Sequence, residues 1–236
     1  MGKVLVDFQD IENYKKGNKC GRPGIEGACY FLDKETLVKI YHVFYKNRIT
    51  HFSDIIDSDI AFPIDILLYE DTNLEAGYTM KYLQGEKFLC GFSDRVLISD
   101  LKKAYLDLKK KIELYRDIYM QDMSLVNIMY SESENKFKLI DTAQWYTCYN
   151  SDKENLKQLD LCLSYAIFKY NASWVSLSDD KSDQLFDLCK WHKLGHTTPF
   201  LEVLEVLEKE LNEKYGVKAE NIADLTPKIV TVQSRR

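Results

Sequence analysis

Three oxygen-bearing side chains surround a predicted hairpin near the middle of the chain. Asp122 and Asn127 precede a short apolar segment at residues 128–130, and Asp141 follows a second one at residues 137–140. The stretch between the two segments is polar, as a hairpin turn requires. Because a tight hairpin brings its ends together, we expect Asn127 and Asp141 to lie side by side, with Asp122 on the loop that leads in.

This set of side chains suits a magnesium–nucleotide site. Magnesium is a hard cation that takes oxygen ligands, usually one or two carboxylates together with substrate phosphates. The remaining carboxylate could accept a proton from an attacking hydroxyl. The alternative, from the residues alone, is a loop Asp and a strand-end Asp selected for turn chemistry.

The same stretch carries a resemblance to a known family. Asp-x-x-x-x-Asn, a short hairpin and an Asp closing an apolar strand are similar to the catalytic and metal-binding loops of the protein kinase-like superfamily. The resemblance implies that Asp122 is the catalytic base and that Asn127 and Asp141 hold magnesium.

The composition limits the classes of function. At 236 residues, 45% of them hydrophobic, the chain can bury a core as one domain or two small lobes. Its net charge of -5 provides no basic field for nucleic acid or an anionic membrane. No apolar run approaches the ~18 residues of a membrane span, and no signal peptide is recognisable. The six cysteines form no Cys-x-x-Cys pair, so we expect a reduced, cytoplasmic protein.

A glycine cluster precedes the second apolar strand of the chain. We expect residues 3–8 to form the first strand, and four glycines then fall within residues 17–27. Without side chains, glycines let backbone N–H groups approach phosphates closely. The cluster resembles the kinase glycine-rich loop between the first two strands, with Gly24 and Gly27 as its final glycines, although an ordinary loop is the alternative.

Lys39 interrupts an otherwise apolar strand at residues 36–41. A lysine in such a strand is costly to bury without anionic partners. By the resemblance it is the lysine that binds the α- and β-phosphates; the alternative is an edge strand with Lys39 in water. Kinases follow this lysine with a helix that carries a paired glutamate. Here no glutamate occurs between Lys39 and Glu70, and Asp54 or Asp57 could substitute, so the partner stays unassigned.

Two further predicted strands, residues 63–69 and 76–83, resemble those that lead into the kinase hinge. The resemblance implies that Met80 is the gatekeeper and that the segment from Lys81 to Leu83 offers backbone hydrogen bonds to adenine. A β-hairpin with a core methionine predicts the same sequence.

The rest of the chain reads as helices with apolar positions three and four residues apart. They span residues 94–119, 154–170, 182–194 and 199–215. Asp160 could brace the backbone of the catalytic loop or lie at the surface. Kinase features missing before the second helix are a full activation segment and the Phe that usually follows the metal-binding Asp.

Taken in chain order, these elements resemble a compact, divergent bacterial-style kinase. The resemblance implies an α+β, bilobal protein kinase-like fold with a small antiparallel β-sheet N-lobe and a mainly helical C-lobe. The N-lobe would span residues 1–83, the C-lobe residues 84–216 and a C-terminal tail residues 217–236.

The implied function is an ATP- and magnesium-dependent phosphotransferase that moves the γ-phosphoryl group to a hydroxyl, with protein Ser/Thr as the favoured acceptor. Its catalytic residues would be Asp122 and Lys39. The nucleotide would also contact Gly24, Gly27, Met80, Lys81 and Leu83. Open alternatives are a pseudokinase-type nucleotide-binding interaction module, a small-molecule kinase, and nucleotidyl or other transfer on the same fold.

Overall fold

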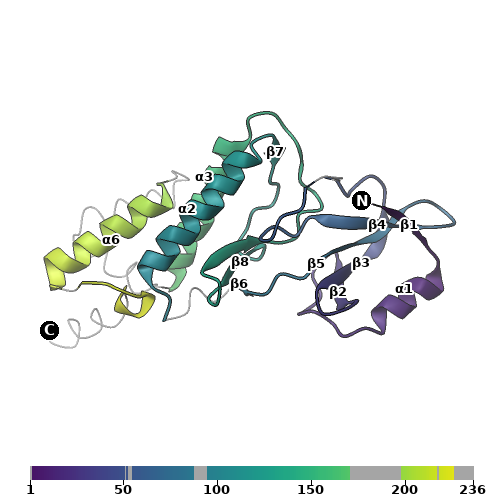
Figure 1. Cartoon of the computed structure of the whole chain (residues 1–236), viewed down its shortest axis with the longest axis horizontal. Helices are drawn as coiled ribbons and strands as arrows, with labels where there is room; N and C mark the ends of the chain where they lie inside the picture. The colour runs from purple at the N-terminus through teal and green to yellow at the C-terminus, as the bar shows by residue number, and fades with distance from the viewer. Residues whose placement is uncertain are drawn as a thin grey trace. The chain divides into compact units, whose positions relative to one another are not determined.

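The computed structural model describes residues 2–50, 52, 55–87, 95–170, 198–216 and 218–225. They fall into two compact units (Figure 1). Unit 1 contains the described residues up to Gln84 together with Lys138–Thr147, and unit 2 contains Gly85–Phe137 and the described residues from Cys148 onward. The segment Lys138–Thr147 therefore groups with the N-terminal unit, whereas the sequence assigned it to the second domain.

Unit 1 is built on a five-stranded sheet in the order β1-β4-β5-β3-β2. The strands are β1 (Lys3–Val6), β2 (Gly27–Phe31), β3 (Thr36–Tyr45), β4 (Pro63–Tyr69) and β5 (Glu75–Lys81). Neighbouring strands are antiparallel, except that β1 runs parallel to β4.

The sequence predicted that the N-terminal strand forms the first arm of the hairpin that contains the glycine cluster of residues 17–27 (the glycine hairpin). The structure shows a different first arm. The N-terminal strand ends at Val6, and Asp7 begins helix α1 (Phe8–Lys15) with a capping box, in which Asp7 and Asp10 each accept a hydrogen bond from the backbone N–H of the other. Residues 18–20 form that arm instead: the N–H of Cys20 donates to Cys29 O at 2.9 Å. The glycine hairpin is thus present, with a different first arm.

Alternation along β3 sends its side chains to two cores. Val38 and Ile40 pack with Val6 and Ile11 on one face of the sheet. Leu37 and Tyr41 pack on the other face, in a cluster that also contains Tyr78 and Met80. Lys39 alternates with Val38 and Ile40, so it shares the face of Leu37 and Tyr41.

No helix occurs between β3 and β4 in the part of that connection that the structure describes, residues 46–50, 52 and 55–62. The connection instead runs as extended and bent chain. Several of its apolar side chains are buried, namely Ile49, Phe52, Ile60, Ala61 and Phe62, whereas Ile56 is exposed. Among these residues, therefore, no helix supplies a glutamate partner for Lys39.

Unit 2 is mainly helical. Within the described residues, its helices are α2 (Ile98–Leu114), α3 (Asp152–Tyr170), α6 (Phe200–Tyr215) and the short 3₁₀ helix η3 (Ile222–Leu225). The predicted helix over residues 94–119 is shorter, because α2 ends at Leu114 and strand β7 (Ile118–Tyr119) follows. The predicted helix over residues 182–194 lies outside the described residues.

The predicted hairpin is confirmed as β8 (Ile128–Ser131) and β9 (Lys136–Leu139). They form a three-stranded sheet with β6 (Glu86–Lys87), which pairs antiparallel with β8. Strand β10 (Tyr146–Thr147) closes the segment of unit 1 that follows β9.

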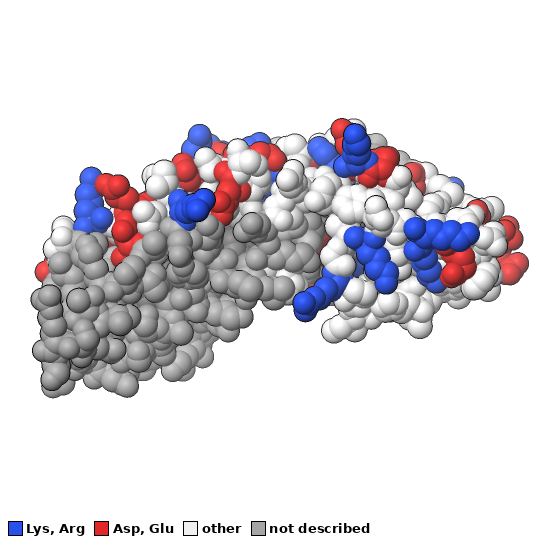
Figure 2. All heavy atoms as spheres, turned by 90° about the horizontal axis from the view of Figure 1, so that it is seen from below, with Lys and Arg blue, Asp and Glu red and all other residues white. Residues whose placement is uncertain are grey.

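The surface shows no dominance of one charge on the face drawn in Figure 2, where Lys and Arg alternate with Asp and Glu over the described residues. Within the described ranges, no helix combines the length and the apolar character needed to cross a membrane.

Candidate functional site

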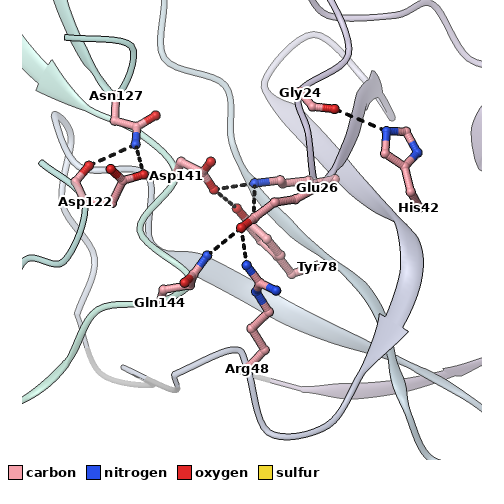
Figure 3. Close-up of polar contacts among 10 residues, drawn as sticks. Gly24, Glu26, His42, Arg48, Tyr78, Asp122, Asn127, Asp141 and Gln144 are labelled. Carbon is pink, nitrogen blue, oxygen red and sulfur yellow. Dashed lines mark hydrogen bonds and ion pairs between the residues drawn. The ribbon is translucent and has the colours of Figure 1, made fainter. Parts of the chain in front are cut away.

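Lys39 of β3 is the centre of a charged cluster in unit 1. Only 7% of the residue is exposed. Its ammonium group forms an ion pair with Asp141 and a second with Glu26, whose Oε2 lies 3.6 Å from Lys39 Nζ (Figure 3). A buried ammonium requires such counter-charges, since desolvation alone would disfavour the charged form. The alternative of an edge-strand lysine in water is wrong.

Two tyrosines flank the ammonium. Their ring centroids lie 5.9 Å (Tyr41) and 5.8 Å (Tyr78) from Lys39 Nζ, within range of cation–π attraction. The hydroxyl of Tyr78 donates to Asp141 Oδ1 at 3.1 Å. Burial and the nearby Asp141 raise the pKa of both phenols, so both remain protonated donors.

Glu26 is the partner that the sequence did not assign. It stands between the last two glycines of the glycine hairpin, and Arg48 and Gln144 both donate to its Oε1, the latter at 2.9 Å (Figure 3). Of the two predicted substitutes, Asp54 lies outside the described residues and Asp57 accepts from the backbone N–H of Asp59. One signal was available: Glu26 is the single acidic residue within residues 17–27.

The loop that carries Asp141 is tied to the chain between β3 and β4. The hydroxyl of Thr142 donates to Ala61 O at 2.8 Å, and the N–H of Thr50 donates to Ala143 O at 2.7 Å. Thr142, which stands where kinases usually carry Phe, is fully buried and satisfied by this bond. These contacts explain why the segment belongs to unit 1.

The fold requires glycine at only one of the two predicted loop positions, Gly24 and Gly27. A Cβ on Gly27 would lie 2.3 Å from Ile40 O, so glycine is required there by the close approach of β2 to β3. A Cβ on Gly24 would meet only Gly27 O, at 3.7 Å. The carbonyl of Gly24 contacts the His42 ring at 3.2 Å. Steric contact with the rest of the fold therefore does not require glycine at position 24.

The predicted hinge residues lie at the end of β5 and directly after it. Met80 and Leu83 are buried in one cluster with Leu37, while Lys81 is exposed. Both the gatekeeper and the core-methionine interpretations require a buried Met80, so the adenine contacts stay a prediction.

Asp122 and Asn127 form a second polar group, in unit 2. The side-chain amide of Asn127 donates to Asp122 O at 3.0 Å and to Asp122 Oδ2 at 3.1 Å. Asp122 has a positive φ of 57°, a backbone conformation that Asp tolerates better than most residues. Asn127 is buried and Asp122 exposed. The loop therefore presents one carboxylate outward and holds it by a buried amide.

A helical asparagine that the sequence did not single out supports this loop. Asn155 of α3 is fully buried; its Oδ1 accepts from Met120 N at 2.9 Å and its Nδ2 donates to Ile118 O at 2.7 Å. The amide side chain carries both a donor and an acceptor, so it satisfies both backbone groups at once.

Asp160 has neither of the two roles predicted for it. It is buried and accepts from the hydroxyl of Tyr105 at 2.7 Å and from the N–H of Phe200, the first residue of α6, at 3.0 Å. Burial raises its pKa above the ordinary value for Asp. Asp160 thus joins α2, α3 and α6 rather than the catalytic loop.

Cys162 lies close to the loop of Asp122 and Asn127 but does not act as a thiolate. Its thiol donates to Met123 O at 3.1 Å, and burial together with the charge of Asp122 raises its pKa to about 11. The juxtaposition of Asn127 and Asp141 stays a prediction, because the two residues belong to different units.

Comparison with solved structures identifies the fold. An apo pseudokinase matches the chain with a TM-score of 0.50 and 9% sequence identity over 96% of each chain. The chain has a protein kinase-like fold. A kinase of the Cydia pomonella granulovirus also matches, with a TM-score of 0.42 and 11% identity, over 55% of this chain and 53% of the viral one.

No protein-family model and no curated protein sequence matches the chain. The likeness to the pseudokinase structure nevertheless confirms the expected α+β, kinase-like fold class. Neither likeness extends to chemistry, since sequence identity is about a tenth, and the activity has to be argued from the residues themselves.

Proposed function

We propose that the protein is a kinase, which transfers the γ-phosphoryl group of ATP to a hydroxyl with the help of magnesium. The single observation that supports this most is the buried Lys39, held between the carboxylates of Glu26 and Asp141. A cation placed at such cost in a kinase-like fold is suited to phosphate oxygens.

The donor set fits magnesium and a phosphate. Among the described residues, Oδ2 of Asp141 and the amide oxygen of Asn127 accept no hydrogen bond, which leaves one hard oxygen on each proposed ligand. The buried hydroxyl of Tyr41 also has no hydrogen-bond partner in the described part of the chain. An acceptor such as a phosphate oxygen would satisfy that hydroxyl.

Each residue then has one role. Lys39 binds phosphate oxygens, Gly24 and Gly27 belong to the loop over the phosphates, and Asp122 orients the acceptor hydroxyl and takes its proton. Magnesium, when bound through Asp141 and Asn127, would neutralise charge on the phosphates. Met80, Lys81 and Leu83 would contact the base of the nucleotide.

The favoured acceptor is a Ser or Thr hydroxyl of a protein. A small-molecule hydroxyl is the second acceptor class, since the chain reaches α3 at Asp152 soon after Asp141 and leaves little length for a peptide-binding activation segment. The pseudokinase alternative is favoured by a different observation: Lys39 is already neutralised by two carboxylates before any nucleotide binds.

The test combines binding with product analysis. Magnesium and ATP should raise the melting temperature of the wild type, because the ligand binds the folded state only. Asp141→Asn should lose the magnesium-dependent part of that rise. Mass spectrometry after incubation with Mg-ATP then separates the functions: an added phosphate indicates a kinase, an added AMP indicates nucleotidyl transfer, and binding without a product indicates a pseudokinase. The absence of any thermal shift at millimolar Mg-ATP would refute the nucleotide site.

A further inference from the structure

We propose that Glu26 is the positioning residue for Lys39 and that Arg48 and Gln144 in turn position Glu26. A glutamate of the glycine hairpin would thus replace a glutamate carried by a helix after β3. The inference rests on the proposed function in one respect, since the ligand of Lys39 is taken to be the phosphate of a nucleotide.

Charge balance supports this role. The ionic groups form an alternating chain, Asp141–Lys39–Glu26–Arg48, with two negative and two positive charges. The side chain of Lys39 is 9% exposed and that of Glu26 27% exposed, so water and salt screen their attraction only in part. If Asp141 turns to a metal ion, Glu26 remains as the second counter-charge beside the buried ammonium group of Lys39.

The backbone of Glu26 is fixed independently of any helix. The N–H of His42 donates to Glu26 O at 2.8 Å, directly after the paired residues Gly27 and Tyr41 of the β2–β3 ladder. Glu26 is therefore held by the same strand that carries Lys39, so the backbone positions of the two residues are fixed relative to each other.

Arg48 is itself well anchored. Its guanidinium lies 4.1 Å from the ring centroid of Tyr45, and the buried Glu75 accepts from the N–H of Arg48 at 2.7 Å and from that of Ile49 at 3.2 Å. Gln144, three residues after Asp141, adds a bond from the metal-binding loop. Glu26 thus connects the glycine hairpin, Lys39 and the Asp141 loop.

A functional consequence follows from this construction. An ion pair built from a strand and its adjoining loop is present without the movement of a helix, so nucleotide binding should need no prior modification or partner. Freshly purified, unphosphorylated protein should bind Mg-ATP with the same affinity as protein preincubated with ATP and then desalted.

The decisive experiment measures whether the effect of Glu26 on Mg-ATP affinity depends on Lys39. Glu26→Gln removes the charge with little change of shape, and Glu12→Gln, in a Glu12–Lys15 pair whose side chains are each 40% exposed, is the matched control. We expect Glu26→Gln to weaken Mg-ATP binding about tenfold in titration calorimetry, as loss of a charge-assisted contact implies, and Glu12→Gln to leave it unchanged. In a Lys39→Met background, Glu26→Gln should have no further effect. Wild-type affinity in Glu26→Gln, or an equal loss in both backgrounds, would overturn the proposal.

Hydrogen exchange without nucleotide separates this inference from the proposed function. The amides of Gly24 and His42, which bond to Gly27 O and Glu26 O, should exchange faster in both Glu26→Gln and Lys39→Met, and at the wild-type rate in Glu12→Gln. If this pattern appears while Mg-ATP does not bind, the coupling of Glu26 to Lys39 stands and the kinase proposal fails. If Mg-ATP binds but neither affinity nor exchange responds to Glu26→Gln, the kinase proposal stands and this inference fails.

Discussion

The two groups of candidate catalytic residues are held together by different forces. In unit 1, Lys39 and Asp141 are 102 residues apart in sequence and Glu26 and Gln144 are 118 apart, and ion pairs dominate their contacts. In unit 2, Asp122 and Asn127 are only five residues apart and are joined by an amide, with neutral hydrogen bonds from α3 behind them.

Under the proposed function, this difference separates binding from chemistry. The charged groups of unit 1 would recruit and orient an anionic ligand, so these residues should affect ligand affinity. Geometry in unit 2 holds one exposed carboxylate, so its residues should affect the reaction step or the stability of the loop. The predictions below test that division, beginning with the largest expected effect.

Asp122→Asn should reduce phosphoryl transfer by about 10²–10⁴-fold, because it removes the proposed general base. Its affinity for Mg-ATP should stay near that of the wild type. Lys39→Ala should lower both transfer and affinity, since it removes a contact made before and during the reaction. Transfer from labelled ATP and parallel binding titrations provide the measurement. Equal transfer by wild type and Asp122→Asn would show that Asp122 is not the base.

Asn155→Leu should lower the free energy of unfolding by about 2–4 kcal/mol, because the buried N–H of Met120 and C=O of Ile118 both lose their partner. Urea denaturation measures the loss. Asn155→Asp can still accept from Met120 but cannot donate to Ile118. Its free energy of unfolding should lie between those of the wild type and Asn155→Leu. A stability of Asn155→Leu within about 0.5 kcal/mol of the wild type would contradict the role of Asn155 as a brace.

Gly27→Ala should destabilise the protein by about 1–3 kcal/mol, since the new Cβ would lie 2.3 Å from Ile40 O and β2 would have to move away from β3. Gly24→Ala is the control with open space, and its melting temperature should remain close to that of the wild type. If the two substitutions cost the same, the close approach of the strands is not what requires Gly27.

Asp160→Asn should change the pH dependence of stability. Burial raises the folded-state pKa of Asp160 above its unfolded value, so the stability linked to its protonated form is present at low pH and is lost as pH rises from about 4 through the folded-state pKa. The variant lacks this loss, and its stability relative to the wild type should therefore improve as the pH rises above about 4. Denaturation at several pH values tests this; a difference that stays constant across the range would argue against the raised pKa.

Local patterns in the sequence predicted much of the fold. The apolar runs of β3, β4 and β5 and the β8–β9 hairpin lie where alternation and turn chemistry placed them. The buried positions of α2 follow the predicted helical spacing, and Gly216 ends α6 in the left-handed conformation, with a φ of 63°. These features depend on neighbours a few residues away, which a single sequence displays.

The missed elements divide into two kinds. Helix α1 carries a readable signal, the capping box of Asp7 and Asp10, although the apolar residues before it favour a longer strand. The edge position of β1 had no such signal, because its pairing with β4 involves residues more than 60 positions away.

The sequence by itself determined which residues are the candidates for chemistry in this protein: Asp122, Asn127, Asp141 and Lys39 stand out by type, order and spacing. Only the tertiary structure decided which side chains hold them, Glu26 with Arg48 and Gln144 on one side and Asn155 on the other. The physical reason is that a buried charge or backbone group must be paired, but any side chain of suitable chemistry can pair it. The path of the chain in three dimensions determines which side chain lies close enough to form the pair.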